Sequence, residues 1–274
     1  MPAGDRTDLG DAMDLKELPA RSFARHPWEI VRADFFLRLL RERIPSQTTS
    51  ALDIGSGDGY FARRLLADFP SVKRLVCFDP AYHAAWLQGK AAADPRLAFT
   101  ATKPAGRFDL VLMLDVLEHV ENDRATLLDG VQSFLGPGGW LLVSVPAGER
   151  LFSRHDEILG HKRRYSPARL RALVKESGLA LIDGGELFAS LLVPRALAKL
   201  GEVVLGREHS RASPAPPHVE TSLGTWKRGP LVTSATTAAL SLDALCSRLA
   251  SRLHLPLAGL STWVLAQNPK TNDR

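Results

Sequence analysis

Apolar and polar positions along the middle of the chain alternate between two patterns, one typical of buried strands and one typical of helices. Short apolar runs such as FDLVLMLDV (108–116) are typical of strands covered on both faces, and the segments between them repeat apolar positions at helical spacing. We therefore expect strands at 49–55, 74–80, 96–101, 108–116, 137–147 and 179–187, separated by helices at 60–69, 81–93, 123–135 and 166–178. This alternation predicts an α/β fold with a doubly wound sheet and right-handed crossovers.

The pattern changes on both sides of this segment. A helix is expected at 28–44, after a polar tail at 1–20. Beyond residue 186 the sequence predicts an apolar helical stretch interrupted by Pro194, a mobile loop rich in Pro, Ser and Gly, a second helix and a last strand at 261–269. The predicted organisation is a tail and helix (1–48), a core (49–186), a helical insertion (187–260) with its mobile loop at 206–230, and a last strand with a tail (261–274).

Composition narrows the class of protein only a little. The chain has 274 residues, 45% of them hydrophobic and 24% charged, which is ordinary for a globular protein with a sizeable core. Its two cysteines cannot form a disulfide framework, and neither a leader-like segment nor a membrane-spanning run is visible, so we expect a cytoplasmic protein. The net charge of +5 is compatible with an anionic substrate, nucleic acid or a membrane surface, and it selects none of them.

The stretch LDIGSGDGY (52–60) places three glycines between the first expected strand and the helix that follows. Gly55, Gly57 and Gly59 permit a tight turn and a close approach of backbone N–H groups to a ligand. A dinucleotide site would need a glycine at position 60, which is occupied by Tyr60, and no Gly-Lys-Ser/Thr follows to form a phosphate-binding loop. The loop therefore disfavours a dinucleotide and lacks the residues of a phosphate-binding loop, and an NAD enzyme is kept as a distant alternative.

Two carboxylates accompany this glycine loop. Asp79 closes the second expected strand about twenty residues after Gly59, where a carboxylate can accept hydrogen bonds from two ribose hydroxyls. Its alternative role is that of a helix N-cap before Pro80. Asp53 precedes the loop and is placed to meet a positively charged ligand group. A ligand that has a ribose and no pyrophosphate suits this combination.

Four segments occur in order along the chain: ALDIGSGDGYFARRLL, LVCFDP, FDLVLMLDVLEHV and LGPGGWLLVSVP. They resemble the signature segments of class I S-adenosylmethionine-dependent methyltransferases, and most closely the small-molecule group that includes the ubiquinone-biosynthesis O-methyltransferases. The resemblance implies a seven-stranded Rossmann-like sheet, a helical insertion between strands six and seven, and S-adenosyl-L-methionine as the cofactor. The cofactor-site residues that it indicates are Asp53, Gly55, Gly57, Asp79, Pro80, Ala101, Thr102 and Asp115.

One segment departs from the family pattern. Family members often carry an acidic residue just after strand three, whereas FTATKPAGRFD has no carboxylate before Asp109. Adenine is therefore expected to be held by backbone groups near Ala101 and Thr102 and by apolar contacts. Asp115 also has a local alternative, because Asp115 and Glu118 have the spacing of a helix capping box.

The segment after strand five, AGERLFSRHDEILGHKRRYSPARL (147–170), concentrates the titratable residues expected near the sulfonium. Methyl transfer is an in-line displacement in which the protein supplies alignment and, for a hydroxyl acceptor, a base. His155 and His161 are the candidate bases, because histidine titrates near neutral pH. The candidate substrate contacts are Arg163, Arg164, Tyr165 and His119. The alternative is a structural clasp in which these side chains pair with nearby backbone groups and acids.

These residues also carry the expectations about function. We expect methylation of a hydroxyl on a small or lipid-linked acceptor, such as a sugar or natural product, which the arginines would suit if it were anionic. The alternatives are methylation of RNA or protein, which the absence of an aromatic, basic binding face disfavours, and a cofactor-binding protein without turnover. No metal is expected, since His155, Asp156 and His161 have no recognisable ligand spacing. The insertion is interpreted as helices packed on the core, a lid, a dimer surface or a peripheral membrane contact; the oligomeric state is left open.

Overall fold

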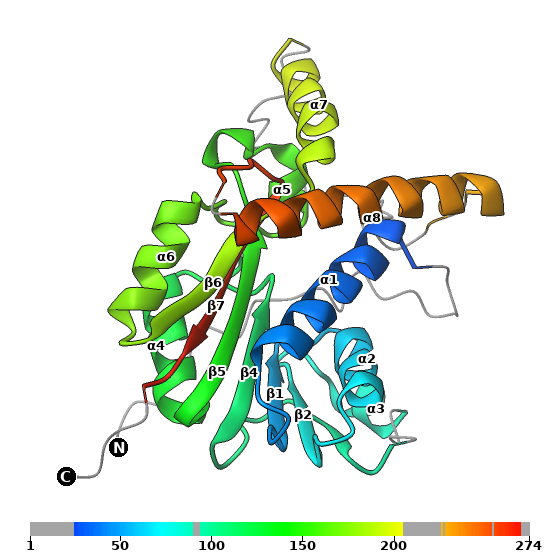
Figure 1. The fold of residues 1–274 in the computed structure, drawn as a ribbon. Helices are drawn as coiled ribbons and strands as arrows, with labels where there is room; N and C mark the ends of the chain where they lie inside the picture. The colour runs from blue at the N-terminus through cyan, green and yellow to red at the C-terminus, as the bar shows by residue number, and fades with distance from the viewer. Residues whose placement is uncertain (1–24, 90–93, 205–225, 227, 254, 270–274) are drawn as a thin grey trace, which may run out of the picture.

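The computed structural model describes residues 25–89, 94–204, 226, 228–253 and 255–269, and it contains a seven-stranded sheet flanked by helices (Figure 1). The strand order is β3-β2-β1-β4-β5-β7-β6, and β7 runs antiparallel to both of its neighbours. The strands are β1 (Ser50–Ile54), β2 (Arg74–Phe78), β3 (Leu97–Thr100), β4 (Phe108–Leu114), β5 (Leu135–Pro146), β6 (Ala180–Leu187) and β7 (Ser261–Gln267). The doubly wound, seven-stranded Rossmann-like fold is therefore confirmed.

Each face of the sheet has its own apolar core. Successive strand residues point to opposite faces, so Ala51 packs in one core while Leu52 packs in the other. Helices α1 (Pro27–Arg43), α2 (Tyr60–Asp68) and α8 (Pro230–Arg252) cover the first face, and α4 (Asp123–Phe134) and α6 (Pro167–Glu176) cover the second (Figure 1). Burial on both faces explains why the central strands read as continuous apolar runs.

Two local expectations are corrected by the structure. The helix expected at 81–93 is shorter in the structure, where α3 spans Ala84–Gln88, about one and a half turns. His83 caps it by accepting a hydrogen bond from Trp86 N. Residues 90–93 lie outside the described residues. The capping box expected at Asp115 and Glu118 is absent, because the chain turns there without forming a helix. Helix α4 begins later, and Asn122 caps it by accepting from Ala125 N at 3.0 Å.

The insertion after β6 consists of a short 3-10 turn (Ala189–Leu191), α7 (Leu192–Val204) and α8. Pro194 does not interrupt a helix as expected. It lies in the first turn of α7, where the missing N–H would have no intrahelical acceptor. Most of the loop expected at 206–230, together with the expected tails at 1–20 and 270–274, lies outside the described residues. Within the described part of the chain, every helix is too short or too polar to cross a membrane.

The polar side of α7 faces the protein and its apolar side faces outward. Lys199 Nζ donates to the Arg150 carbonyl at 2.6 Å, and Arg154 N donates to Glu202 at 3.1 Å. Val193 and Leu197 are exposed by 66% and 63%. Polar contacts therefore hold α7 above the end of the sheet, where it projects from the rest of the molecule (Figure 1).

Replacement of Gly259 by Ala is expected to lower the free energy of unfolding by about 1–3 kcal/mol, because the added methyl overpacks the junction of β6 and β7. A Cβ atom at Gly259 would lie 2.5 Å from the Leu187 carbonyl oxygen and 2.6 Å from its nitrogen, so backbone must move. Gly201→Ala in α7 is the matched control, because its Cβ meets no atom within 4 Å. The control is expected to leave stability unchanged or to raise it by up to about 1 kcal/mol. Urea denaturation of both variants measures the difference, and equal stabilities would contradict the packing argument.

Candidate functional site

The glycine loop begins where β1 leaves the sheet. Gly55 and Gly57 have φ values of +70° and +53°, in the left-handed region that favours glycine. Gly55 N donates to the Phe78 carbonyl at 2.7 Å, which ties the loop to the end of β2. A Cβ at Gly57 would meet no atom within 4 Å, so the space beside it is open, whereas a Cβ at Gly59 would lie 2.6 Å from the Phe99 ring. The backbone of the loop is therefore accessible to a ligand at Gly57, whereas at Gly59 it is packed against a neighbouring side chain.

The strand register brings the other expected cofactor residues to the same edge. Ile54 pairs with Phe78, and Phe78 pairs with Thr100. The residues that follow these three strands therefore leave the sheet side by side. Those residues are Gly55, then Asp79 and Pro80, then Ala101 and Thr102. This juxtaposition is what a nucleoside bound across the carboxyl edge of the sheet requires.

Asp53 and Asp79 form an acidic pair beneath the loop. Asp79 is fully buried, and its Oδ1 accepts from Ala81 N at 2.9 Å. Since His83 caps the helix that follows, Asp79 is not the helix N-cap of the alternative interpretation. Asp53 is 3% exposed, and burial together with the charge of Asp79 raises its pKa to about 7. A hydroxyl donor at Asp79 and a cation near Asp53 would both be favoured by this arrangement.

Aromatic side chains that the sequence analysis did not single out pack beside the loop. The Tyr82 hydroxyl donates to the Gly57 carbonyl at 2.5 Å and contacts Ser56 Oγ at 2.8 Å. The Tyr82 ring stacks on Trp86, with centroids 4.2 Å apart and planes 9° apart. Phe99 meets both rings edge to face. An aromatic residue three positions after the strand-ending acid was the available signal, but the sequence could not show that its hydroxyl returns to the glycine loop.

Asp115 follows β4 in a strained backbone conformation and is held by a residue from α1. Its φ is +58°, which is uncommon for a residue other than glycine. Arg32 forms an ion pair with Asp115 Oδ2, and Ser144 Oγ lies 3.3 Å from its other oxygen. Sequence reasoning missed Arg32, because the helical pattern of α1 says nothing about which loop the helix approaches.

A cavity of about 280 Å³ opens next to Asp115. The carboxylates Asp53 and Asp79 are not among its lining residues, so Asp115 is the expected cofactor residue that borders it. Its walls come from α1, the turn after β4, the loop after β5 and the segments beside β7. The lining residues are His26, Trp28, Glu29, Arg32, Asp115, Glu118, His119, Pro146, His155, Leu159, His161, Arg164, Leu191, Leu260 and Ser261.

Asp156 lies at the centre of a charged cluster at the wall of this cavity. It is fully buried, and it accepts from His161 Nδ1 at 2.9 Å, from Arg164 Nε at 2.8 Å and from Arg195 Nη2 at 2.5 Å. Burial by itself raises the pKa of Asp156, but the hydrogen bond from His161 and the charges of Arg164 and Arg195 outweigh it and hold the pKa well below its usual range. Asp156 is therefore ionised and orients His161. Arg195, from α7, could not be linked to this cluster by sequence.

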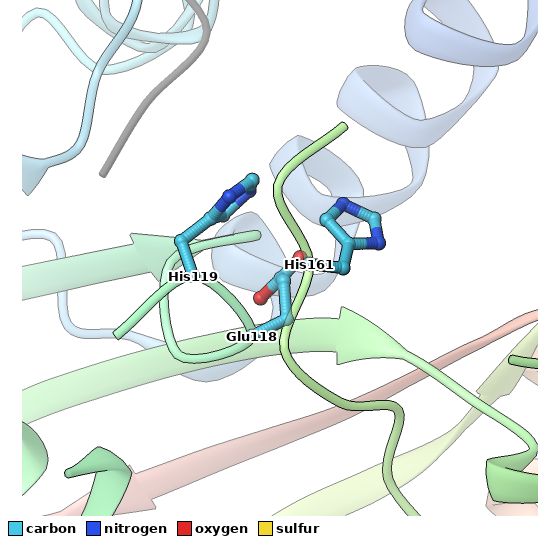
Figure 2. Close-up of side chains that lie close together, drawn as sticks. All are labelled: Glu118, His119 and His161. Atoms are coloured by element: carbon cyan, nitrogen blue, oxygen red, sulfur yellow. The ribbon is translucent and has the colours of Figure 1, made fainter. Parts of the chain in front are cut away.

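Glu118, His119 and His161 come together from two loops (Figure 2). One possible ligand atom of each lies within 4.8 Å of those of the other two. Burial, and after it the nearby His161, lowers the pKa of His119 to about 4, so this ring is neutral at neutral pH. Two imidazoles and a carboxylate form a donor set that is able to hold a divalent metal ion. The sequence expectation of no metal considered only the spacing within the His155–His161 loop.

The remaining expected substrate residues are placed differently. His155 borders the cavity, and burial together with the charge of Arg195 lowers its pKa. Arg164 also borders it, but its guanidinium is committed to Asp156 and to the Ala147 carbonyl. Arg163 donates to the Glu121 carbonyl at 2.8 Å and is not among the lining residues.

Tyr165 is corrected from an expected substrate contact to a core residue. It is fully buried, and its hydroxyl donates to the Leu117 carbonyl at 2.9 Å and lies 3.0 Å from Asp123 Oδ2. A side chain whose polar atom is satisfied inside the core cannot also reach an acceptor. The structural clasp that the sequence analysis kept as an alternative therefore describes Tyr165.

A family model described as a methyltransferase domain matches residues 21–183, which is more than half of the chain. An uncharacterized methyltransferase of Mycobacterium bovis is 33% identical over 108 residues, which cover 38% of this chain and 54% of that protein. The mitochondrial ubiquinone biosynthesis O-methyltransferase of Candida albicans is 32% identical over 114 residues, which cover 38% of this chain and 34% of that protein. The chain thus spans about half, or less, of the length of these curated relatives.

Solved structures show the same fold at low sequence identity. Phosphoethanolamine N-methyltransferase 2 of Haemonchus contortus, in complex with S-adenosyl-L-methionine, superimposes with a TM-score of 0.51 at 16% identity, over 86% of this chain and 52% of that chain. The matched family model covers the glycine loop, Asp79, Asp115 and the histidine loop. The chain therefore belongs to the methyltransferase domain family, with the class I fold and S-adenosyl-L-methionine as its cofactor.

Proposed function

We propose that the protein is an S-adenosylmethionine-dependent O-methyltransferase that acts on a hydroxyl of a small molecule, or of the polar head of a lipid-linked one, such as a sugar or natural product. The observation that carries this proposal is the cavity beside Asp115, in whose wall an ionised Asp156 orients His161. Its volume of about 280 Å³ suits a small group rather than a macromolecular surface. The likeness to a ubiquinone biosynthesis O-methyltransferase of Candida albicans supports the choice of oxygen.

His161 is the histidine that we propose activates the acceptor hydroxyl. An oriented imidazole with a carboxylate behind it resembles the arrangement that fixes a catalytic histidine in other enzymes. In the described part of the chain no hydrogen bond joins His155 to a carboxylate, and the charge of Arg195 disfavours its protonated form. During transfer the acceptor oxygen attacks the methyl carbon in line, the C–S⁺ bond breaks, and sulfur keeps the electron pair as S-adenosylhomocysteine leaves.

The cavity favours a neutral acceptor over the anionic one expected from the sequence. That expectation was based on the many arginines of the loop, and Arg163 and Arg164 are engaged by Glu121 and Asp156. The described lining of the cavity contains two arginines, Arg32 and Arg164, against three acids, Glu29, Asp115 and Glu118. This balance favours a neutral hydroxylated group.

Incubation with methyl-labelled S-adenosylmethionine and a fractionated extract of the source cells tests the proposed function. We expect label in the small-molecule or lipid fraction, stable to alkali and carrying the chemical shift of an O-methyl carbon. Label in RNA or protein would contradict the proposal, as would an N-methyl product. Cofactor binding without S-adenosylhomocysteine release in every fraction would indicate a binding protein.

Replacement of His161 by Gln is expected to lower turnover by about 100- to 10,000-fold, the usual range for losing a group that assists proton removal. Cofactor affinity should stay nearly unchanged, since the cavity that His161 lines is bordered by neither Asp53 nor Asp79. The rate of S-adenosylhomocysteine release and calorimetry with the cofactor measure the two effects. His155→Gln is the matched control and should lose much less activity; the reverse order of the two variants would overturn the assignment.

A further inference from the structure

Two histidines at the acceptor cavity each use one ring nitrogen to contact the protein. His161 Nδ1 donates to Asp156 Oδ1 at 2.9 Å. The Nδ1 side of the His119 ring lies against Gly160, and its buried Nε2 has no hydrogen-bond partner among the described residues. In both rings, Nε2 is the nitrogen left to meet a ligand.

This arrangement is the one found behind metal-binding histidines. Such histidines donate the N–H that does not face the metal to a carboxylate or a backbone carbonyl, which fixes the tautomer and the ring orientation. His161 has the carboxylate of Asp156 in this role, and the Nδ1 side of His119 lies against Gly160. Arg164 and Arg195 contact the same carboxylate and hold it in place as the acceptor for His161.

His119 supplies the observation that points to a ligand. The residue is 5% exposed, and its Nε2 is enclosed without a hydrogen-bond partner from the described part of the chain. A buried polar atom without a partner destabilises the fold, and a bound cation would supply that partner. The His161 ring lies edge to face with it, with centroids 4.8 Å apart and planes 82° apart.

Glu118 completes the donor set. It is fully buried in the same turn as His119, and its carboxylate extends from that turn toward the two rings (Figure 2). The three possible ligand atoms lie within 4.8 Å of one another. Ligands at about 2.0–2.2 Å from a shared ion lie at most about 4.4 Å apart, so small side-chain rotations would close the set.

We propose that Glu118, His119 and His161 bind a divalent transition-metal ion and leave one coordination position open toward the acceptor cavity. Zn²⁺ is the ion that this site favours. Two nitrogens and one carboxylate suit Zn²⁺, whereas Mg²⁺ and Ca²⁺ prefer sites made of oxygen. Three protein ligands are typical of catalytic zinc sites, which leave the fourth position to water or substrate. Asp115 is excluded from the set by its ion pair with Arg32.

The catalytic role of this ion rests on the proposed function. An acceptor hydroxyl in the open position would have a lowered pKa and would lose its proton to solvent water. The bound oxygen would then form the new O–CH₃ bond as the C–S⁺ bond of the cofactor breaks. His161 would in this way activate the hydroxyl indirectly, by binding the metal ion, and Asp156 would position the His161 ring.

Metal binding is tested without any acceptor. The full chain is treated with chelator, desalted and titrated with ZnCl₂ in a calorimeter, and metal content is measured after gel filtration. We expect about one Zn²⁺ per chain, and a Co²⁺-loaded sample with the visible absorption of a low-coordinate nitrogen and oxygen site. Glu118→Gln, His119→Gln and His161→Gln should each weaken Zn²⁺ binding by about 100-fold or more, and His155→Gln should leave it unchanged.

Binding of S-adenosylmethionine to the same variants reports whether they are folded. Variants that keep cofactor affinity and lose Zn²⁺ support the site. Wild-type protein that binds less than one-tenth of an equivalent, or variants that all bind like wild type, would overturn it. O-methylation that persists in metal-free protein would refute the catalytic role of the ion and leave the proposed function intact. Zn²⁺ binding without any O-methyl product would support the metal site and refute the proposed function.

Discussion

Replacement of Asp79 by Asn is expected to raise the dissociation constant of S-adenosylmethionine by about 10- to 100-fold. The carboxylate is buried at the end of β2, beside the glycine loop, where hydrogen bonds from ribose hydroxyls to a charged acceptor are worth about 1.5–3 kcal/mol. Asn keeps an oxygen for Ala81 N, which Asp79 Oδ1 contacts at 2.9 Å, so the local turn is retained. Calorimetric titration with the cofactor and with S-adenosylhomocysteine measures the loss, which should be similar for both.

Asp109→Asn is the control for this experiment. Asp109 lies in β4 near its amino end, and it accepts from the backbone and side chains of Thr49 and Ser50 at the start of β1. Its replacement removes a carboxylate with comparable backbone contacts at the opposite edge of the sheet, so stability falls and cofactor affinity stays. Unchanged affinity in Asp79→Asn, or an equal loss in both variants, would show that the ribose is held elsewhere.

Replacement of Asp156 by Asn is expected to lower the free energy of unfolding by about 3 kcal/mol and to reduce turnover severely. Removing one partner of a buried ion pair leaves its counter-charges unmatched, which costs more than the pair contributes. Here the stranded charges are Arg164, buried in the loop, and Arg195, from α7, and His161 loses the acceptor that orients it. Denaturant unfolding measures the first effect, and S-adenosylhomocysteine release at matched folded protein measures the second.

The stability loss should depend on pH in a defined direction. The pKa of Asp156 is depressed in the folded protein, so its contribution is present above the unfolded-state pKa of about 3.9 and is lost as pH falls toward the folded-state value. The difference between wild type and Asp156→Asn should therefore be constant near neutrality and should shrink below about pH 4. A difference that grows on acidification would contradict this account.

Asp183→Asn separates the two roles of Asp156. Asp183, on β6, has a side chain that is only 6% exposed; it pairs with Arg43 and Arg248 and accepts from Ser251. Its replacement should also cost stability, because the buried Arg248 loses one of its two carboxylate partners, but it should leave turnover per folded molecule intact. Equal loss of turnover in both variants would mean that Asp156 acts through stability alone.

Local sequence patterns determined the architecture of this protein. Apolar runs buried on both faces predict the central strands, helical periodicity predicts α1, α2, α4, α6 and α8, and glycines with an acid at the end of the next strand predict the cofactor edge. These signals are readable because each depends on neighbours in sequence, namely on strand pleat, helix pitch or backbone freedom at glycine. The errors lie where local rules compete, as in α3, in the turn after Asp115 and at Pro194.

The chemistry beside the cofactor was decided by tertiary structure alone. Arg32 reaches Asp115 from α1, Arg195 reaches Asp156 from α7, and His161 meets Glu118 and His119 across two loops. Sequence periodicity and motif spacing do not predict such contacts, since each depends on where a packed helix or the end of a strand places a side chain. The sequence therefore determined the sheet and predicted the edge where the cofactor is expected, whereas only the folded chain decided which charges are paired and which histidines are oriented.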